Sequence, residues 1–371
     1  MSLTDSKLHN LIESELQKVI NASGKMSKLG ISTLSDEVTD AMKSGAQSFY
    51  VMDDLRNMAG RHIASYLNTE AAMITNSASS AIILAISGLL TKDNTHLVHN
   101  MNARHHLPQN EVIIMTGHNI DYGAPIETMI RLTGADVAFA GYANGCTLKQ
   151  IQQVISDRTL AMIYVQSHHC VQKNMPDLND VTQLMKEHNI PFLIDAAAET
   201  DITAYSVLGD LCIISGSKAI SGPTTGILAG KQAYIDYAKS HEKGIGRAMK
   251  VGKESIIGLL RALQLYSPDD LSENAQRSLF APIQAIDRLP GVTSSVIKDG
   301  SRSIYRLRIS IDPTRANMTA LDIVKALKQG DIAIYTRDYH ANQGFFEIDP
   351  RALTEHDAHI IYTKLKQLLG S

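Results

Sequence analysis

Apolar and polar positions follow two different spacings along this chain, and together they predict alternating helices and strands. Apolar residues spaced three and four apart predict helices, and short apolar runs bounded by polar residues or glycine predict buried strands. Such an alternation predicts an α/β fold with a doubly wound, mostly parallel sheet that binds ligands at the carboxyl ends of its strands. The predicted strands are Ala71–Ile74, His96–His99, Glu111–Met115, Asp136–Ala140, Leu160–Val165, Pro191–Ile194, Leu211–Ser215 and Gly226–Ala229.

The pattern changes toward both ends of the chain. Residues 5–19 predict an amphipathic helix, and residues 231–266 predict a long helical region that leads to a second domain. Beyond Pro290, short strands alternate with two helices that begin with capping-box patterns at Thr319 and Thr354. We therefore expect an N-terminal helix and extended arm over residues 1–50, a large α/β domain over 51–265, and a small α+β domain with an antiparallel sheet over 266–371.

Composition narrows the class of protein. The chain has 371 residues, of which 44% are hydrophobic and 20% charged, as is ordinary for a globular enzyme. The net charge of −3 gives no basic surface for nucleic acid, and no apolar stretch reaches the roughly 18 residues of a membrane span. The N-terminus lacks a secretory signal pattern, and the three cysteines are far apart in the sequence. We expect reduced thiols and a cytoplasmic location.

Lys218 carries the most specific chemical signal. It lies among small residues in Ser215–Pro223, and the apolar run Pro191–Ile194 ends upstream at Asp195. A lysine amine can form a Schiff base with pyridoxal phosphate, and an aspartate can pair with the pyridine nitrogen and keep it protonated. Either residue alone is also explained by an ordinary strand end and a turn, but together they indicate pyridoxal 5'-phosphate as the cofactor.

A phosphate site is predicted at Asn76–Ala81, where a strand ends and a helix begins. Free backbone N–H groups and the helix dipole there favour an anion. Simple helix capping would explain the same residues. Together with Lys218 and Asp195, phosphate binding is the better interpretation for Ser77, Ala78, Ser79 and Ser80.

Two further strand ends carry histidines. His118 and Tyr122 follow Glu111–Met115, where a planar group could cover the pyridine ring, and His118 is the candidate because it is nearer to the strand end. One residue of the pair His168–His169 is expected to face the cofactor, since adjacent residues of an extended segment point in opposite directions. His168 is the candidate, with His169 as the alternative. No cysteine or carboxylate spacing completes a metal site around these histidines.

Arginines are the candidates for binding an anionic substrate, because a guanidinium fork suits a carboxylate or phosphate. Arg337, at the end of the predicted strand Ile332–Tyr335, is the main candidate. Arg306 and Arg308 share one strand face and are better explained as solvated. Arg247 and Lys250 could hold a second phosphate, although surface charges at a helix start would look the same.

These segments resemble the L-seryl-tRNA(Sec) selenium transferase family, above all its short D-glucosaminate-6-phosphate ammonia-lyase type members. The landmarks are Ile20–Gly24 with Leu29-Gly30, the lysine segment Ser215–Gly226, and Arg247–Val251. The resemblance implies fold type I of the pyridoxal-phosphate enzymes, with Lys218 as the Schiff-base lysine, Asp195 as the partner of the pyridine nitrogen, and Ser215 and Ser217 completing the phosphate cup.

Two departures from the family pattern bear on the substrate. The selenium transferases carry an N-terminal tRNA-binding region, whereas here only the residues before Val19 precede the shared motif, and Ile31 follows Leu29-Gly30 where those enzymes usually have arginine. We therefore expect a lyase that deaminates a small amino acid or amino-sugar acid by α,β-elimination. The best guess is conversion of D-glucosaminate 6-phosphate to 2-keto-3-deoxy-6-phosphogluconate and ammonia.

Other activities remain open at this stage. They are a selenium or sulfur transferase acting on seryl-tRNA, a pyridoxal-phosphate racemase or aldolase using the same lysine, and a cofactor-binding protein without turnover. Fold type I also implies a homodimer or larger even homo-oligomer, in which Tyr50 could contact the neighbouring site. Neither nucleic acid nor a membrane is expected as a partner.

Overall fold

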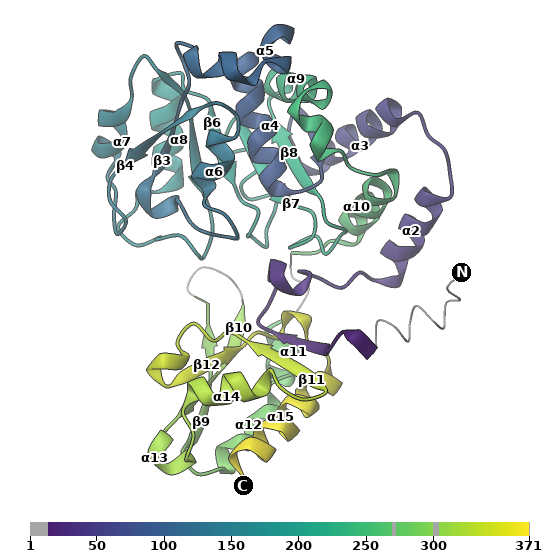
Figure 1. Ribbon diagram of the computed structural model, residues 1–371, viewed down its shortest axis with the longest axis vertical. Helices are drawn as coiled ribbons and strands as arrows, with labels where there is room; N and C mark the ends of the chain where they lie inside the picture. The colour runs from purple at the N-terminus through teal and green to yellow at the C-terminus, as the bar shows by residue number, and fades with distance from the viewer. Residues whose placement is uncertain (1–13, 269–271, 300–303, 371) are drawn as a thin grey trace. The chain divides into compact units, whose positions relative to one another are not determined.

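The chain forms two compact units in this computed structural model, which describes residues 14–268, 272–299 and 304–370. The large unit is Leu34–Pro268, and the small unit combines the described parts of residues 1–33 and 269–371 (Figure 1). Residues 1–50, expected as an arm of their own, are thus divided between the two units. The sequence pattern did not show this division because the first strand of the small unit pairs with a partner near the other end of the chain.

The large unit is built on a seven-stranded sheet with the strand order β2-β8-β7-β6-β5-β3-β4. β8 runs antiparallel to both of its neighbours, and the other neighbouring pairs are parallel. This is the mostly parallel sheet that the alternating pattern predicted. Its strands are β2 (Ala71–Thr75), β3 (Glu111–Met115), β4 (Asp136–Ala140), β5 (Thr159–Val165), β6 (Phe192–Asp195), β7 (Leu211–Ser215) and β8 (Gly226–Gly230).

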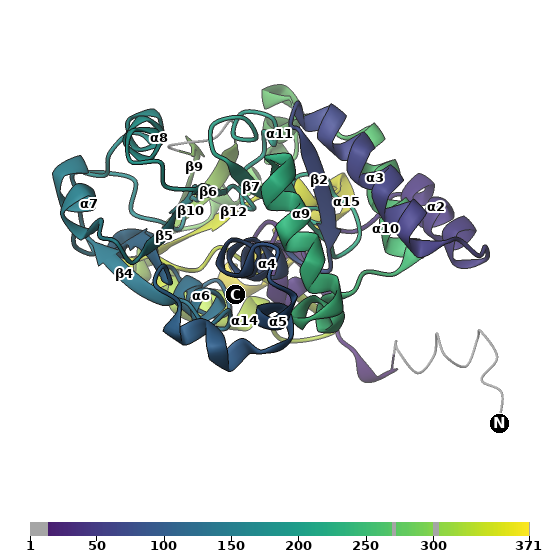
Figure 2. The same ribbon diagram turned by 90° about the horizontal axis from the view of Figure 1, so that it is seen from above.

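Helices cover both faces of this sheet (Figures 1 and 2). Successive residues of β3 show why: Val112 and Ile114 join the core cluster on one face, and Ile113 and Met115 join the cluster on the other. A strand buried on both faces reads as a continuous apolar run. The helices of the large unit are α2 (Asp36–Ala46), α3 (Met52–Leu67), α4 (Ala78–Thr91), α5 (Thr95–His99), α6 (Ile126–Arg131), α7 (Leu148–Val154), α8 (Leu178–Glu187), α9 (Gln232–Ser240) and α10 (Lys253–Leu265).

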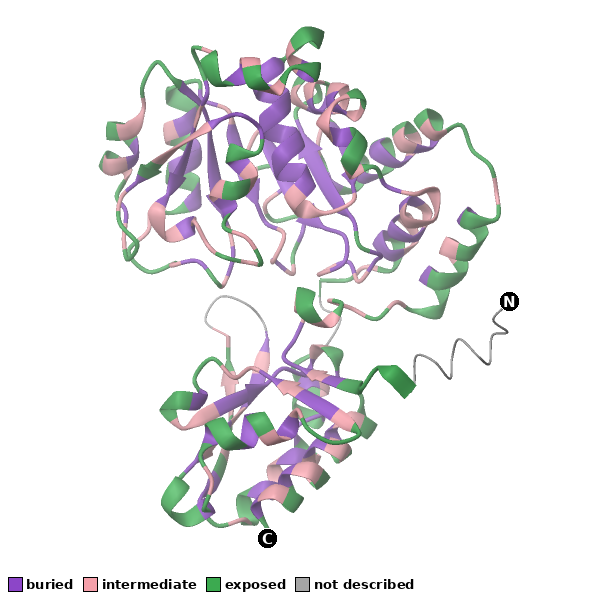
Figure 3. Cartoon of the chain, in the orientation of Figure 1, coloured by how far each residue is buried: buried purple, intermediate pink, exposed green. Residues whose placement is uncertain are grey.

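Helix α4 lies at the centre of one of these layers. All of its residues from Ser80 to Thr91 are buried, as the purple ribbon in Figure 3 shows. A helix that is apolar on all sides is one enclosed by other elements. The first turn of α4 is therefore held firmly in place at the edge of the sheet.

Two predictions for the large unit were wrong. His96–His99 is not a strand but the one-turn helix α5, which begins where Asn94 Oδ1 accepts a hydrogen bond from the Leu97 amide. Residues 231–266 are not one helical region, because Gly244 and Gly252 lie at breaks between α9 and α10. Short 3₁₀ helices occupy the break and other connections of this unit: η2 (Met101–His106), η3 (Thr116–His118), η4 (His241–Lys243) and η5 (Ile245–Met249).

The small unit contains two sheets. An antiparallel sheet has the order β12-β10-β9, and β1 pairs in parallel with β11. Its strands are β1 (Lys18–Ala22), β9 (Val292–Lys298), β10 (Tyr305–Ile311), β11 (Ile332–Thr336) and β12 (Phe345–Ile348). The predicted antiparallel sheet is therefore present, and β1 and β11 form a second, separate sheet.

Helices pack on these sheets around a separate core cluster. The capping boxes at Thr319 and Thr354 are formed as predicted. The helices are α11 (Glu273–Ser278), α12 (Ala281–Gln284), α13 (Pro313–Ala316), α14 (Ala320–Leu327) and α15 (Glu355–Leu369), with the 3₁₀ helices η1 (Ser27–Leu29), η6 (Ala285–Arg288), η7 (Ala341–Gln343) and η8 (Pro350–Ala352).

The N-terminal prediction is corrected in its last residues. Residues 5–13 of the predicted amphipathic helix lie outside the described residues, and Val19 belongs to strand β1. Val19 pairs with Ala333 of β11, so its neighbour in the sheet decides its conformation. Among the described residues, every helix is too short or too polar to cross a lipid bilayer.

Candidate active site

The predicted site segments meet at one edge of the large sheet. Thr75 of β2 and Ser215 of β7 both pair with Gly226, at the start of β8. Asp195, the last residue of β6, pairs with Val165 of β5 on one side and with Ile213 of β7 on the other. The loops that carry the candidate lysine, aspartate, serines and histidines therefore leave the sheet at neighbouring positions.

Lys218 lies in a tightly bonded loop between β7 and β8. The Gly216 amide donates to the Thr225 carbonyl at 2.9 Å, and the Gly222 amide donates to the Gly216 carbonyl at 2.8 Å. A β-carbon on Gly216 would come within 2.1 Å of Thr225 Oγ1, so a larger residue would open the loop. Lys218 itself is half-buried. The small residues around it thus fix the backbone from which its side chain extends.

The start of α4 forms a hydroxyl-lined turn directly beside this loop. Ser77 caps the helix by accepting a hydrogen bond from the Ser80 amide at 3.1 Å, and the Ser77 and Ser80 hydroxyl oxygens lie 3.0 Å apart. Ser80 Oγ donates in turn to Asn76 Oδ1. Ala78 and Ser79 occupy the first helical positions, where backbone N–H groups have no partner within the helix. Capping and anion binding are compatible here, because Ser77 satisfies one of these donors and leaves others.

Gly226 brings the two halves of the candidate phosphate cup together, and sequence reasoning did not identify its role. A β-carbon at this position would lie 2.3 Å from the Ser77 carbonyl carbon. At the end of the neighbouring strand β7, the buried hydroxyl of Ser215 lies 3.3 Å from that of Ser217 in the lysine loop. Glycine at the start of β8 therefore allows β8 to approach the first turn of α4. The trailing glycine of the lysine segment was the available signal.

Asp195 is almost completely buried, with 7% of its surface exposed. Its Oδ1 accepts a hydrogen bond from the Ala197 amide at 3.0 Å. Burial raises the pKa of Asp195, while that hydrogen bond and the positive charge of Lys218 lower it in part. A buried carboxyl of this kind gains most from a cationic hydrogen-bond donor. The protonated nitrogen of a pyridine ring is such a donor, so the site fits the cofactor inferred from the sequence.

His118 lies deeper than expected. It has no exposed surface, its Nδ1 accepts a hydrogen bond from the Val165 amide at 3.2 Å, and its ring meets Tyr164 edge-on at 4.6 Å between centroids. Burial lowers the pKa of His118 to about 4, partly offset by the backbone of Val171. The neutral ring therefore holds the end of β3 against the end of β5, and its Nε2 has no hydrogen-bond partner among the described residues.

His168 and His169 do not alternate as expected for an extended segment. They form a turn in which the Cys170 amide donates to the Ser167 carbonyl at 3.0 Å, and their ring centroids lie 3.9 Å apart. In such a turn the two rings need not point in opposite directions. His168 is half-buried and His169 exposed, so His168 remains the candidate of the pair.

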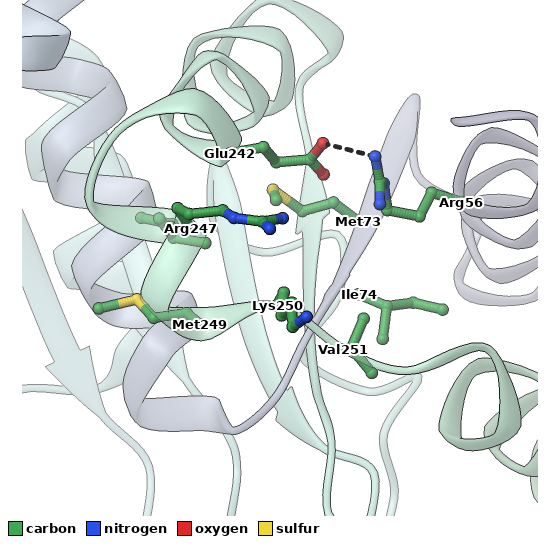
Figure 4. A pocket seen from close by; sticks show the side chains of 10 residues that line it. Arg56, Met73, Ile74, Glu242, Arg247, Met249, Lys250 and Val251 are labelled. Carbon is green, nitrogen blue, oxygen red and sulfur yellow. Dashed lines mark ion pairs between the residues drawn. The ribbon is translucent and has the colours of Figure 1, made fainter. Parts of the chain in front are cut away.

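Arg247 and Lys250 line a cavity of about 70 Å³ in the large unit. Figure 4 shows Arg56 and Glu242 on the other side of this cavity, joined by an ion pair of 3.3 Å. Among the described residues, neither Arg247 nor Lys250 has a carboxylate partner, and both are exposed. The cavity thus carries more positive than negative charge, as an anion site requires.

Arg337 lies in a cluster of charged residues within the small unit. Its side chain is 10% exposed, its ion pair with Glu347 is long at 3.9 Å, and its terminal nitrogen donates to the Ser23 carbonyl at 3.4 Å. Its Nε has no hydrogen-bond partner among the described residues. Burial and the neighbouring charge of Arg306 lower the pKa of Arg337. An incompletely paired guanidinium of this kind is suited to an added carboxylate.

Arg306 is not solvated, contrary to the sequence-based interpretation. It is 5% exposed and pairs with Asp299 at 2.7 Å and with Asp349 at 3.4 Å. Arg308 is more exposed and pairs with Glu347 at 2.9 Å. The sequence pattern could not show this, because the carboxylates come from other segments.

The motif Ile20–Gly24 owes its composition to the same cluster. The Asp349 amide donates to the Ala22 carbonyl, and Asn21 holds the turn through a 2.8 Å hydrogen bond to the Gly24 carbonyl. Gly24 has φ +89°, and a β-carbon there would lie 2.7 Å from the Arg351 guanidinium. Glycine is therefore required both by the backbone and by the close arginine.

Tyr50 lies in the large unit, in the segment between α2 and α3. It is 41% exposed, and its neighbour Phe49 is completely exposed. Lys253 lies over the Phe49 ring at 5.1 Å from its centroid. The described residues of this chain place no candidate cofactor residue against Tyr50.

Comparison with known proteins places these features in a family. A profile of the L-seryl-tRNA selenium transferases (SelA) matches residues 19–283. The chain is 36% identical to D-glucosaminate-6-phosphate ammonia lyase of Salmonella typhimurium, over 95% of this chain and 96% of that protein. It is 31% identical to 5'-C-glycyluridine monooxygenase-decarboxylase of a Streptomyces species, over 95% of this chain and 90% of that protein.

A solved structure of D-glucosaminate-6-phosphate ammonia-lyase superposes with a TM-score of 0.90 at 35% identity, covering 97% of this chain and 98% of that one. The fold is fold type I of the pyridoxal-phosphate enzymes, and pyridoxal phosphate is the cofactor of this group. The chain belongs to the L-seryl-tRNA selenium transferase family.

Proposed function

We propose that this protein is a pyridoxal-phosphate-dependent ammonia-lyase, a carbon–nitrogen lyase that acts on D-glucosaminate 6-phosphate. The observation that carries the proposal is the convergence of Lys218, the buried Asp195 and the first turn of α4 at adjacent strand ends. The 36% identity to a D-glucosaminate-6-phosphate ammonia lyase over almost the whole chain supports the choice of substrate.

Each candidate residue has a role in holding the cofactor. Lys218 would bind it covalently, Asp195 would accept a hydrogen bond from its ring nitrogen, and the first turn of α4 would bind its phosphate through Ser77, Ala78, Ser79 and Ser80 together with Ser215 and Ser217. His168 would approach the ring from the end of β5. When bound, the cofactor draws electrons from the substrate's α-carbon and so acidifies the α-proton.

The protein's own groups then move the proton and hold the substrate. Lys218 Nζ takes the α-proton, for which its half-buried position beside the Asp195 carboxyl is suited. Arg337 would bind the substrate carboxylate, and Arg247 and Lys250 would bind the distal phosphate. Loss of the hydroxyl on the β-carbon, followed by hydrolysis, yields 2-keto-3-deoxy-6-phosphogluconate and ammonia.

We also propose that the protein acts as a homodimer or larger even oligomer. The fully exposed Phe49, with Tyr50 and Val51 beside it, forms an apolar segment suited to burial against a second copy. The three cysteines of this protein are free and buried, which supports a reducing compartment such as the cytoplasm. Light scattering of the purified protein would measure the oligomeric state.

The test of function is an assay for ammonia and 2-keto acid with D-glucosaminate 6-phosphate. We expect both products in equal amounts, and unphosphorylated D-glucosaminate should have a higher KM because it lacks the anion for Arg247 and Lys250. An Arg247→Ala variant should remove much of that difference between the two substrates. Lys243→Ala, an exposed cation outside the cavity lining, is the matched control.

Other outcomes would redirect the assignment. Product formation from seryl-tRNA and a selenium or sulfur donor, with none from the sugar acid, would favour the transferase. Oxygen uptake with release of carbon dioxide would instead favour a reaction like that of the 31% identical monooxygenase-decarboxylase. Either result without ammonia from D-glucosaminate 6-phosphate would overturn the proposed activity.

A further inference from the structure

Tyr122 has a buried hydroxyl that makes no hydrogen bond of full geometry among the described residues, although the Ser79 side chain is close enough to act on it. It lies in the segment after η3, enclosed by the bridge between Asp121 and Pro125. Its ring packs with Ala78 against the core cluster on the α4 side of the sheet. A buried hydroxyl that lacks a full hydrogen bond is unfavourable, so this group is suited to a ligand that accepts one.

The neighbours of the hydroxyl indicate which ligand. Burial raises the pKa of Tyr122, the nearby Ser79 side chain lowers it, and the charge of Asp195 raises it further. The hydroxyl therefore stays protonated at neutral pH and lies near both groups. Ser79 is in the first turn of α4, within the candidate phosphate cup. The hydroxyl therefore lies beside the turn that is the candidate for binding the phosphate.

His118 and Tyr122 have different structural roles. The His118 ring is enclosed by the ends of β3 and β5, and its Nδ1 is already occupied by the Val165 amide. Tyr122 comes from the same connection but packs toward α4, on the opposite face of the sheet from Tyr164. His118 Nε2 and the Tyr122 hydroxyl both lack a hydrogen-bond partner among the described residues, and of the two it is Tyr122 that packs on the side of α4.

We propose that Tyr122 is a cofactor-binding residue whose hydroxyl donates a hydrogen bond to the phosphate of pyridoxal phosphate, beside Ser79. The inference rests on the proposed function only in requiring that this cofactor binds. It adds a donor from the β3–α6 connection to a cup otherwise formed by α4 and the lysine loop. His118 becomes a residue that positions the strand ends.

The experiment is a binding titration of the cofactor-free protein with pyridoxal phosphate and, separately, with pyridoxal, which lacks the phosphate. Absorbance and intrinsic tyrosine fluorescence report binding without any turnover. For Tyr122→Phe we expect the Kd of pyridoxal phosphate to rise by about 10-fold or more, as for loss of a hydrogen bond to a charged group, with the Kd of pyridoxal unchanged. Tyr142→Phe, at an exposed tyrosine, should change neither.

Three results would overturn the inference. Equal weakening of both ligands would mean that Tyr122 contacts the ring, and a shifted absorption band with unchanged affinities would mean that it contacts the ring's phenolic oxygen. Unchanged binding of both would mean that it contacts neither. If the unaltered protein binds no pyridoxal phosphate, the proposed function itself fails, which separates the two failures. Thermal unfolding of Tyr122→Phe, expected near that of the unaltered protein, shows that the variant folds.

Discussion

Gly226 and Ser77 approach each other so closely that a β-carbon on Gly226 would lie 2.3 Å from the Ser77 carbonyl carbon. One residue begins strand β8, which follows the lysine loop, and the other caps helix α4. This contact joins the two segments proposed to share the cofactor phosphate. The shape of the candidate phosphate site thus depends on residue 226 being glycine.

Gly226→Ala should displace the first turn of α4. We expect a loss of about 1–3 kcal/mol in the free energy of unfolding, as for overpacking in a well-packed site, together with weaker binding of pyridoxal phosphate. Denaturant unfolding and a cofactor titration would measure the two effects. Gly145→Ala is the control, because the nearest atoms to an added β-carbon there lie at 3.3 Å. Equal effects at both positions would contradict the role of the contact.

Lys218→Ala should abolish turnover and leave the fold intact. The loop around Lys218 is held by hydrogen bonds of Gly216 and Gly222, which the substitution does not remove. We expect an unchanged melting temperature of the cofactor-free protein and no protein label after borohydride reduction with pyridoxal phosphate. Mass spectrometry detects the label in the unaltered protein. A label that persists in Lys218→Ala would assign the covalent link to another lysine.

Asp195→Asn should keep the shape of the site but lose the charge. The amide cannot stabilise a proton on the ring nitrogen as a carboxylate does, so removal of the substrate α-proton should slow by about 10²-fold or more. Exchange of the α-proton with deuterium from solvent measures this step directly. Cofactor binding should remain, because the phosphate cup is separate. A normal exchange rate would exclude Asp195 as the partner of the ring nitrogen.

Two buried histidines predict a pH dependence of stability. Burial lowers the pKa of His118 to about 4, and burial together with the charge of Arg104 lowers that of His241 to about 4. Because the unfolded chain binds these protons near pH 6.5, it holds more protons than the folded state between pH 6.5 and 4. The free energy of unfolding should therefore fall as the pH falls through this window.

The measurement is the free energy of unfolding at a series of pH values from 7 to 4.5. His241→Gln should make the dependence less steep, since one of the two protons is no longer taken up on unfolding. His241 lies away from the proposed cofactor site, hydrogen-bonded to Thr91 at 2.8 Å. A slope that is identical in the variant would show that His241 does not stay neutral in the fold.

Asp349→Asn should destabilise the small unit. Burial alone would raise the pKa of Asp349, but Arg351, Arg306 and Arg337 together lower it overall, so the carboxylate is charged and central to the cluster. Breaking such a buried pair costs about 3–5 kcal/mol. Denaturant unfolding measures the loss, with the exposed Asp331→Asn as the control. A cost below 1 kcal/mol would mean that the arginines do not depend on this carboxylate.

The sequence predicted the sheet because its signal is local. β3, β4 and β7 begin and end where the apolar pattern placed them, and α14 and α15 begin directly after the predicted caps Thr319 and Thr354. The ends of the strands then placed Asp195 and Lys218 at one edge without any knowledge of distances. Short segments were harder: in α5 a single asparagine cap outweighs a strand-like composition.

The missed features depend on contacts between distant segments. Arg306 looked solvated because Asp349 and Asp299 approach it only in the folded unit. The position of His118 after a strand likewise gave no sign of the Val165 amide that binds its Nδ1. Strand β1 was predicted as the end of a helix because the strand that it pairs with, Ile332–Thr336, lies far away in the sequence.

The pairing of β1 with β11 also sets an order of events during synthesis. Lys18 lies opposite Ile332, so the first described strand leaves the ribosome long before its partner has been made. The large unit, Leu34–Pro268, is fully translated before β11 is made and can fold first. The small unit must instead pair segments from opposite ends of the chain, which is slow for contacts so distant in sequence. Until Ile332–Thr336 has been translated, the strand that carries Ile20 and Asn21 lacks the partner with which it pairs in the folded unit.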